Sequence, residues 1–419
     1  MANEDLHFRA ATTDELDRVL EIHLVAFPDA RAEPERRRNF TASRFGSLDD
    51  LVLVERAGEI VGHAFLFPLK AWFGGRSVPL GGVASLAIAP EARGQGIGTA
   101  LLRHLHRASD VRGDALTMLY AFRQRFYARH GYGTTASRKR LAIDPASVPA
   151  SWRALAKGRI RRPRGDDKDA IAAAYARAAA KSSGWLSRGN IDWERQLARE
   201  RRQFLVADRP ASEGRPTMAG YVAFEVVQSE AHAATSIRVG ELVADDAVTR
   251  LVLLGALGAM RDQVVEIELE VDASDPLELA LVDSDGRRFG TDQVEHDLGS
   301  VVGGPMLRIE DVPRAIEARG YAAEGTFDVV VRAGEGEVDG AGEEIAVSVR
   351  VAGGRAEVSA ARAASGAIRT TKASLASILY GGLRLSDAVR LGLADADTRT
   401  LARLDAILAM APLAPVDPF

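Results

Sequence analysis

The chain has 419 residues, of which 47% are hydrophobic and 27% are charged, and these proportions exclude a disordered or fibrous protein. Lys and Arg total 54 against 58 Asp and Glu, so the formal net charge is −4 and no nucleic-acid partner is expected from it. The absence of cysteine excludes disulfides, thiolate metal ligands and a cysteine nucleophile.

The N-terminal stretch MANEDLHFRAATTDEL carries acids where a signal peptide needs a basic region followed by an apolar one. No apolar run reaches the roughly 18 to 20 residues that a membrane-spanning helix requires. We therefore expect a cytoplasmic protein without a membrane span.

The first part of the chain predicts alternating helices and strands. Apolar spacing predicts a helix, a hairpin, a third strand, a helix, a buried strand and a short helix. In chain order these elements cover residues 12–27, 51–69, 81–89, 99–111, 115–122 and 124–133. In the second predicted helix, Leu101, Leu102 and Leu105 form one apolar face.

The second part repeats that order of elements. A helix, two strands, a segment containing a strand and a helix, and a further strand are predicted at 166–182, 203–208, 219–227, 236–263 and 264–271. The loop between strand and helix, LVADDAVTR, contains Asp245 and Asp246 and no glycine. We expect it not to bind an anion.

The pattern changes again near residue 303. Residues 306–321 predict a strand, a turn and a short helix, and the alternating apolar residues of 325–361 are broken by glycine turns, as in an antiparallel meander. Helices are expected at 371–381 and 397–410. These elements predict a small third domain that combines helices and strands.

Three glycines, Gly94, Gly96 and Gly98, stand where the helix at 99–111 should begin. Glycine costs about 0.5–1 kcal/mol relative to alanine within a helix. At a helix N-terminus, however, free N–H groups and the dipole attract anions, and missing side chains let a phosphate approach. The spacing is not G-x-G-x-x-G and no Lys-Ser/Thr pair follows, so neither a dinucleotide fingerprint nor a P-loop is present. A glycine turn that only connects strand and helix is the alternative.

The stretch LAIAPEARGQGIGTALL resembles the acyl-CoA loop of the GCN5-related N-acetyltransferases (GNAT), through Arg93, Gly96 and Gly98. The resemblance extends to the enhanced intracellular survival (Eis) branch through FYARHGYG, RIEDVPRAIEARGY and the ending PVDPF. It implies an α/β (α+β) fold with two tandem GNAT-like domains, 1–147 and 148–300, of which the second lacks the cofactor loop. A sterol-carrier-protein-like domain, 301–419, and assembly into a hexamer are also implied.

The resemblance implies acetyl-CoA as cosubstrate, with the diphosphate held by backbone N–H groups between Arg93 and Thr99 and the pantetheine arm along the preceding strand. The expected contacts are Leu86, Ala87, Ile88, Arg93, Gly94, Gln95, Gly96, Ile97, Gly98, Thr99, Phe122 and Arg123. Phe122 and Arg123 stand where the Eis branch has a Ser-Glu pair, a departure that changes the charge of the substrate side. A main-chain N–H near Leu86 is expected to meet the oxyanion.

Tyr127 is the expected proton donor, because a phenol with a pKa near 10 is protonated at neutral pH and a thiol leaving group has a pKa near 8.5. The resemblance puts this tyrosine beside the cofactor sulfur, whereas a core aromatic residue is the alternative. The eight histidines form no cluster, and we expect no metal.

The resemblance makes the base the terminal carboxylate of Phe419. Three prolines in APLAPVDPF stiffen this segment, and an ordinary flexible tail is the alternative. An α-carboxyl pKa of about 3.5 lies far below the roughly 10.4 of an amine, so Phe419 is expected to orient the amine or relay its proton before acting as a strong base.

The resulting hypothesis is an acetyl-CoA-dependent N-acetyltransferase that acts directly on a primary amine. The acceptor would be an aminoglycoside-like small molecule or the lysine side chain of a peptide. A non-catalytic acyl-CoA or lipid-binding carrier, built around the third domain, is the alternative function.

Overall fold

The computed structural model describes residues 5–28, 31–189, 193, 196–197, 201–209, 217–228, 235–281, 297–334, 336–338, 344–361, 366–413 and 417. The chain forms two compact units. One contains residues 1–135, 305–411 and 417–419, and the other contains residues 136–304 and 412–416.

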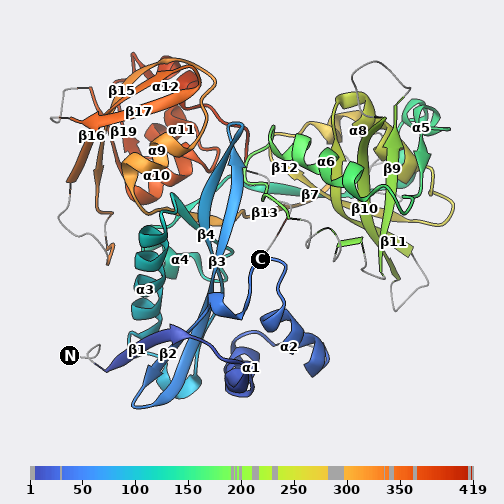
Figure 1. Ribbon diagram of the computed structural model, residues 1–419. Helices are drawn as coiled ribbons and strands as arrows, with labels where there is room; N and C mark the ends of the chain where they lie inside the picture. Colours follow the sequence, from blue (N-terminus) through green and yellow to red (C-terminus); the bar gives the residue numbers. More distant parts are fainter. Residues whose placement is uncertain are drawn as a thin grey trace. The chain divides into compact units, whose positions relative to one another are not determined.

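The first unit contains a seven-stranded sheet within its described residues, in the order β1-β2-β3-β4-β5-β14-β6. Figure 1 labels its first four strands, β1 to β4. Its strands are β1 (Leu6–Ala10), β2 (Leu51–Arg56), β3 (Glu59–Phe73), β4 (Arg76–Ile88), β5 (Leu116–Leu119), β14 (Met306–Ile309) and β6 (Gly133–Thr134). Its helices are α1 (Leu16–Ala26), α2 (Glu33–Thr41), α3 (Ile97–Arg112) and α4 (Gln124–Ala128). The pairing of β4 with β5 is parallel.

Helix α3 packs on the sheet through the apolar face that the sequence predicts. Leu101, Leu102 and Leu105 are completely buried, in one core cluster with residues of β3 and β4. The helix ends at Gly113, whose φ of 88° stops it in the left-handed conformation. This packing fixes the direction in which the N-terminus of α3 points.

The second unit contains another seven-stranded sheet within its described residues, in the order β13-β7-β12-β11-β10-β9-β8. Its strands are β13 (Gly299–Val302), β7 (Arg138–Ile143), β12 (Glu266–Asp272), β11 (Thr235–Ala244), β10 (Met218–Gln228), β9 (Arg202–Asp208) and β8 (Ile160–Arg161). Its helices include α5 (Ala150–Ala156), α6 (Lys168–Ala179) and α8 (Ala247–Gly258). The repeated order of elements is therefore confirmed.

The third sheet, in the first unit, has the order β17-β16-β15-β18-β19 among the described residues. Its strands are β17 (Arg355–Ala360), β16 (Glu344–Ala352), β15 (Gly325–Arg332), β18 (Ile368–Thr371) and β19 (Ala394–Asp395). The accompanying helices are α9 (Val312–Ala318), α10 (Lys372–Leu379), α11 (Leu385–Arg390) and α12 (Leu401–Leu408). The antiparallel meander is present as β15, β16 and β17.

Two strands lie in sheets that chain order does not predict. β7 belongs to the second sheet although its residues fall within the first predicted domain. β14 falls within the third predicted domain but pairs with β5 and β6 of the first sheet, with Met306 opposite Leu119 and Thr134. The first sheet is therefore built from chain segments that lie before and after residues 136–304 of the second unit.

Among the described helices, none is long and apolar enough to cross a membrane.

Candidate active site

Strands β4 and β5 separate along their length. They pair only from Leu80 to Gly82 on β4, against Leu116 to Met118 on β5, although β4 continues to Ile88. A cavity of about 250 Å³ opens beyond the last pair. Its lining residues are Phe27, Val83, Ala84, Ser85, Leu86, Leu119, Tyr120, Phe122 and Tyr127, all of them uncharged.

A β-bulge lies in β4 at the wall of this cavity. His63 pairs with Ala87 and Phe65 pairs with Ala84, so Ser85 and Leu86 together face the single residue between those partners. Ser85 has a φ of 51°, which is rare for a residue with a side chain. Because a bulge leaves one backbone unit outside the ladder, an N–H near Leu86 can serve a ligand in the cavity.

The glycine loop leads from β4 to α3 and presents bare backbone. Gly94 and Gly96 have φ angles of 75° and 78°, and a Cβ built on either would meet nothing within 4 Å. Gly96 is the N-cap of α3 without a side-chain cap, and Ala100 donates the first backbone hydrogen bond, 3.0 Å to the Gly96 carbonyl. The N–H groups ahead of Ala100 therefore lack an intrahelical partner. Such a loop fits a diphosphate.

The side chains of the loop turn away from its exposed backbone. Arg93 Nε donates to the Ile88 carbonyl at 3.1 Å, and the Gln95 amide donates to the Glu91 carbonyl at 3.2 Å. The Ile97 side chain is buried in the core, and Thr99 Oγ1 lies 3.4 Å from His130 Nε2. These side chains therefore have partners within the protein, and the backbone N–H groups of the loop remain for a ligand.

Tyr127 comes from α4, which follows the end of β5. Its side chain is buried, lines the cavity and packs edge-on against Phe126, with ring centroids 5.0 Å apart. Burial raises the pKa of Tyr127 to about 12, so the phenol keeps its proton over the whole neutral range.

The structure brings some of the predicted site residues together and separates others. Leu86, Phe122 and Tyr127 line the same cavity. Ala87 and Ile88 continue β4 beyond the bulge, paired with His63 and Gly62, and Arg123 is exposed at the N-cap of α4. The predicted base, Phe419, lies outside the described residues.

The chain near its C-terminus is nevertheless anchored in the first unit. The Asp417 side chain is 2% exposed, and its Oδ1 lies 3.3 Å from Arg44 Nη1, in the segment that follows α2. Arg44 also stacks over the Phe45 ring, with its guanidinium carbon 4.5 Å from the ring centroid. A buried charge of this kind needs its partner, so the pair holds residue 417 in place.

The sequence analysis missed several residues of the cavity wall. These are Phe27, Val83, Ala84, Ser85, Leu119 and Tyr120. Most belong to apolar runs that predict only a buried strand or helix, and nothing in the sequence distinguishes them from the core. For Ser85 the feature that matters is a backbone angle, which no local sequence pattern signals.

Comparison with known families agrees with this geometry. The family described as "Acetyltransferase (GNAT) domain" matches residues 7–135, and a second family of the same description matches residues 184–309. The chain is a GNAT acetyltransferase. The family described as "Sterol carrier protein domain" matches residues 312–416, so the tandem GNAT folds are followed by a sterol-carrier-like domain.

Individual proteins show the same relationship. This GNAT acetyltransferase is similar to N-acetyltransferase Eis of Mycobacterium tuberculosis, at 29% identity over 367 residues, which cover 84% of this chain and 83% of the relative. A GCN5-related N-acetyltransferase structure from Kribbella flavida has a TM-score of 0.78 and 24% identity, over 99% of this chain and 98% of that chain. Eis1 from Mycobacterium abscessus has a TM-score of 0.73 and 21% identity, over 99% and 100%. These two structural likenesses concern the fold.

Proposed function

We propose that this acetyltransferase moves an acetyl group from acetyl-CoA directly to a primary amine. The acceptor is an aminoglycoside-like small molecule or the lysine side chain of a peptide. The observation that carries the proposal is the cavity between β4 and β5, where the bulge at Leu86 and the Tyr127 side chain line one uncharged space. The exposed backbone of the glycine loop follows the same strand.

Acetyl-CoA supplies the acetyl group as a thioester. In our proposal, the backbone N–H groups from Arg93 to Thr99 hold its diphosphate, and the positive end of the α3 dipole adds to the attraction. An N–H near Leu86 donates to the acetyl oxygen as negative charge develops there, which is where a fixed donor lowers a barrier most.

Tyr127 faces the leaving group. A phenol with a pKa of about 12 is a weak acid toward a thiol, whose ordinary pKa is near 8.5. Its principal contribution is therefore a hydrogen bond that stabilises the departing thiolate. The proton passes to the sulfur only as the amine loses its own proton.

The terminal carboxylate of Phe419 orients the amine and relays the proton that the amine loses. The buried pair of Asp417 with Arg44 supports this role, because it fixes the chain two positions before Phe419. The cytoplasmic location and the hexamer stay predictions.

Thiol release from acetyl-CoA, measured with a panel of amines, tests the function. Tyr127→Phe should lower kcat about 100-fold, the lower range for a general acid, while the Kd for acetyl-CoA stays within about twofold. Tyr120→Phe removes a hydroxyl from the same cavity and should cost less than about tenfold. Because the pKa of Tyr127 is raised to about 12, loss of its proton should not reduce the rate between pH 7 and 10.

Three outcomes would each contradict the proposal or one of its residue roles. An unchanged kcat in Tyr127→Phe at every pH would remove the tyrosine from the mechanism. Tight acetyl-CoA binding without turnover on any amine would favour the alternative, a carrier of acyl-CoA or lipid. A protein extended at its C-terminus that keeps full activity would remove Phe419 from the mechanism.

A further inference from the structure

Helix α4, which carries Tyr127, is short, and the carbonyls of Tyr127 and Ala128 accept from N–H groups of the turn that follows it. It has five residues, and the chain behind it turns at Gly131, whose φ is 77°. The next two carbonyls along the chain, those of Arg129 and His130, accept hydrogen bonds from a distant part of the chain. The Val338 N–H donates to the Arg129 carbonyl at 2.9 Å, and Arg308 Nε donates to the His130 carbonyl at 3.0 Å. Both donors come after residues 136–304 of the second unit in the sequence.

Arg308 is itself held in a buried network. It lies in β14, is 8% exposed and forms an ion pair with Glu310, two residues further along the same strand. The Thr117 hydroxyl of β5 donates to Glu310 Oε1 at 2.7 Å and lies 3.1 Å from the Tyr132 hydroxyl. With its carboxylate partner fixed in this way, the guanidinium has little freedom to leave the His130 carbonyl.

The same contacts extend to the cofactor helix. Arg103 Nη2 of α3 donates to the Val338 carbonyl at 2.8 Å, so the Val338 peptide groups contact α3 and the end of α4 together. His130, whose carbonyl accepts from Arg308, has its ring 3.4 Å from the Thr99 hydroxyl at the start of α3. The glycine-loop helix and the tyrosine helix are thus joined through one set of hydrogen bonds.

We infer that Arg308 is a positioning residue for acyl transfer, which fixes the C-terminal end of α4 and thereby the place of the Tyr127 hydroxyl in the cavity. The inference rests on the proposed role of Tyr127. It gives the strand that returns from the second unit a part in the reaction, because β14 completes both the sheet and the support of the tyrosine helix.

The test compares Arg308→Met and Arg308→Lys by steady-state kinetics in the full chain. Misplacing a catalytic group by about 1 Å costs on the order of 100-fold, so Arg308→Met should lower kcat 10- to 100-fold. The KM for acetyl-CoA should change less than about threefold, since the glycine loop is untouched. A lysine can donate to one acceptor but lacks the forked geometry, so Arg308→Lys should recover only part of the rate.

The decisive measurement is the double variant. If Arg308 acts through Tyr127, adding Arg308→Met to Tyr127→Phe should lower kcat less than about threefold further, because groups that act as a unit are not additive. A merely structural role would instead multiply the two losses. Should Arg308→Met fail to fold, Arg308→Lys in the same double variant gives the same discrimination.

Arg314→Met is the matched control. Arg314 also connects the late part of the chain to the first fold, donating 2.9 Å to the Asp114 carbonyl, but at the far end of α3 from the glycine loop. Its kcat should stay within about twofold of the parent. Wild-type kcat in both Arg308 variants, or multiplied losses in the double variant, would overturn the inference alone. An unaffected Tyr127→Phe would overturn the proposed function on which it rests.

Discussion

The two GNAT folds of this chain share a bulged strand and the helix that follows it. They differ in the side chains beside the bulge and at the N-terminus of the helix. In each, a hairpin leads through a bulged strand into a helix, β3–β4–α3 in the first and β10–β11–α8 in the second. The first fold leaves the bulge beside a cavity and leaves the helix N-terminus bare. The second fold fills both places with its own side chains.

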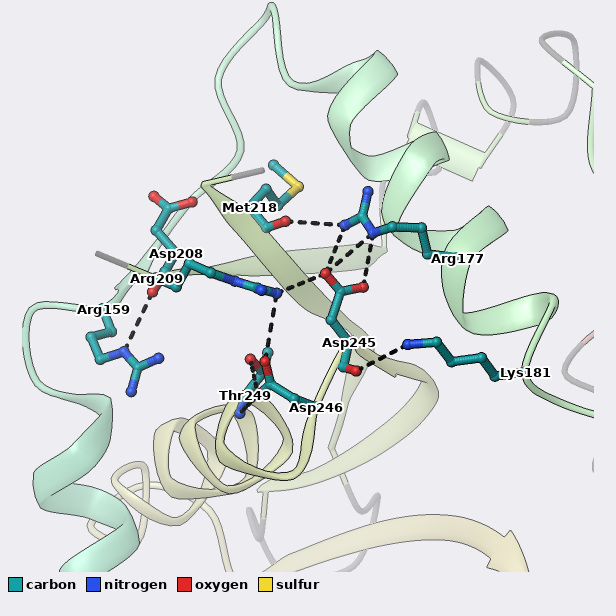
Figure 2. Close-up of polar contacts among 9 residues, drawn as sticks. All are labelled: Arg159, Arg177, Lys181, Asp208, Arg209, Met218, Asp245, Asp246 and Thr249. Atoms are coloured by element: carbon teal, nitrogen blue, oxygen red, sulfur yellow. Dashed lines mark hydrogen bonds and ion pairs between the residues drawn. The ribbon is translucent and has the colours of Figure 1, made fainter. Parts of the chain in front are cut away.

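The helix N-termini show the contrast most directly. Gly96 caps α3 without a side chain, whereas Asp246 caps α8 and accepts from the Thr249 N–H at 2.8 Å. Burial opposes ionisation of Asp246, but its bonds to Thr249 and the nearby charges of Arg209 and Arg159 together outweigh that effect and lower its pKa. Asp245 next to it accepts from Arg177 at 3.0 Å and from Arg209 at 2.7 Å (Figure 2). The second loop therefore carries its own anions.

The bulges show the same contrast. On β11 the extra residue is Gly240, since Ala223 pairs with Glu241 and Phe224 pairs with Val239. The Glu241 carboxylate accepts from Arg188, Arg202 and the Tyr221 hydroxyl, each at 2.7 Å. Buried charged groups fill the second fold beside its bulge, where the first has an open space. Side chains can therefore fill the places beside the bulge and at the helix N-terminus while the backbone keeps the same arrangement.

The largest expected effect comes from breaking that buried cluster. Burial alone would raise the pKa of Glu241, but Arg188 and Arg202 lower it to about 2, so the group is ionised and paired. Glu241→Gln leaves two buried guanidiniums without the carboxylate that balances their charge. The substitution should lower the free energy of unfolding by about 3–5 kcal/mol. Urea unfolding followed by tryptophan fluorescence measures this, because Trp152, Trp185 and Trp193 all belong to the second unit.

Glu268→Gln is the matched control, because it makes the same substitution within the second unit, in the surface pair of Glu268 with Arg238. An exposed pair contributes about 0–1 kcal/mol, so its unfolding midpoint should hardly move. Acetyl-CoA affinity should be unchanged in both variants. Equal midpoints for the two would mean that the Glu241 cluster does not stabilise the second fold.

The next largest effect is expected on acetyl-CoA affinity, when a substitution makes the first loop resemble the second. Gly96→Asp puts a carboxylate at the N-cap of α3, at a φ of 78° that aspartate tolerates better than most residues do. Like charges brought together cost several kcal/mol, so the Kd for acetyl-CoA should rise about 100-fold in calorimetric titration. Gly96→Asn carries the same shape without the charge, and its loss should be clearly smaller. Parent affinity in Gly96→Asp would place the diphosphate elsewhere.

The elements whose signals are local were predictable from the sequence. The buried face of α3 at Leu101, Leu102 and Leu105, the glycine loop and the repeated order of elements all follow from spacing within about 20 residues. The difference between the two loops was also visible, because the second loop contains Asp245 and Asp246 and no glycine.

The features that depend on distant pairing were not predictable. β14 joins β5 across more than 180 residues of chain, with Ile309 opposite Leu116, and a strand of four residues, three of them apolar, fits either sheet equally well. The support of α4 by Arg308 follows from that pairing and was missed with it. The residues that line the cavity share the composition of the core, so the separation of β4 from β5 has no local signature.

The smallest effect is expected from Asp246, whose substitution tests whether this carboxylate excludes acetyl-CoA from the second loop or only caps helix α8. Asp246→Ala removes the cap of α8 and should cost about 1 kcal/mol, while Asp246→Asn keeps a side-chain acceptor and should cost less. Calorimetry should still find one acetyl-CoA per chain in both variants, because Asp245 and the bulk of its arginine partners remain in the loop. A second bound equivalent in Asp246→Ala would show that one carboxylate alone kept the second fold from binding the cofactor, and the filled bulge at Glu241 would then have no part in excluding it.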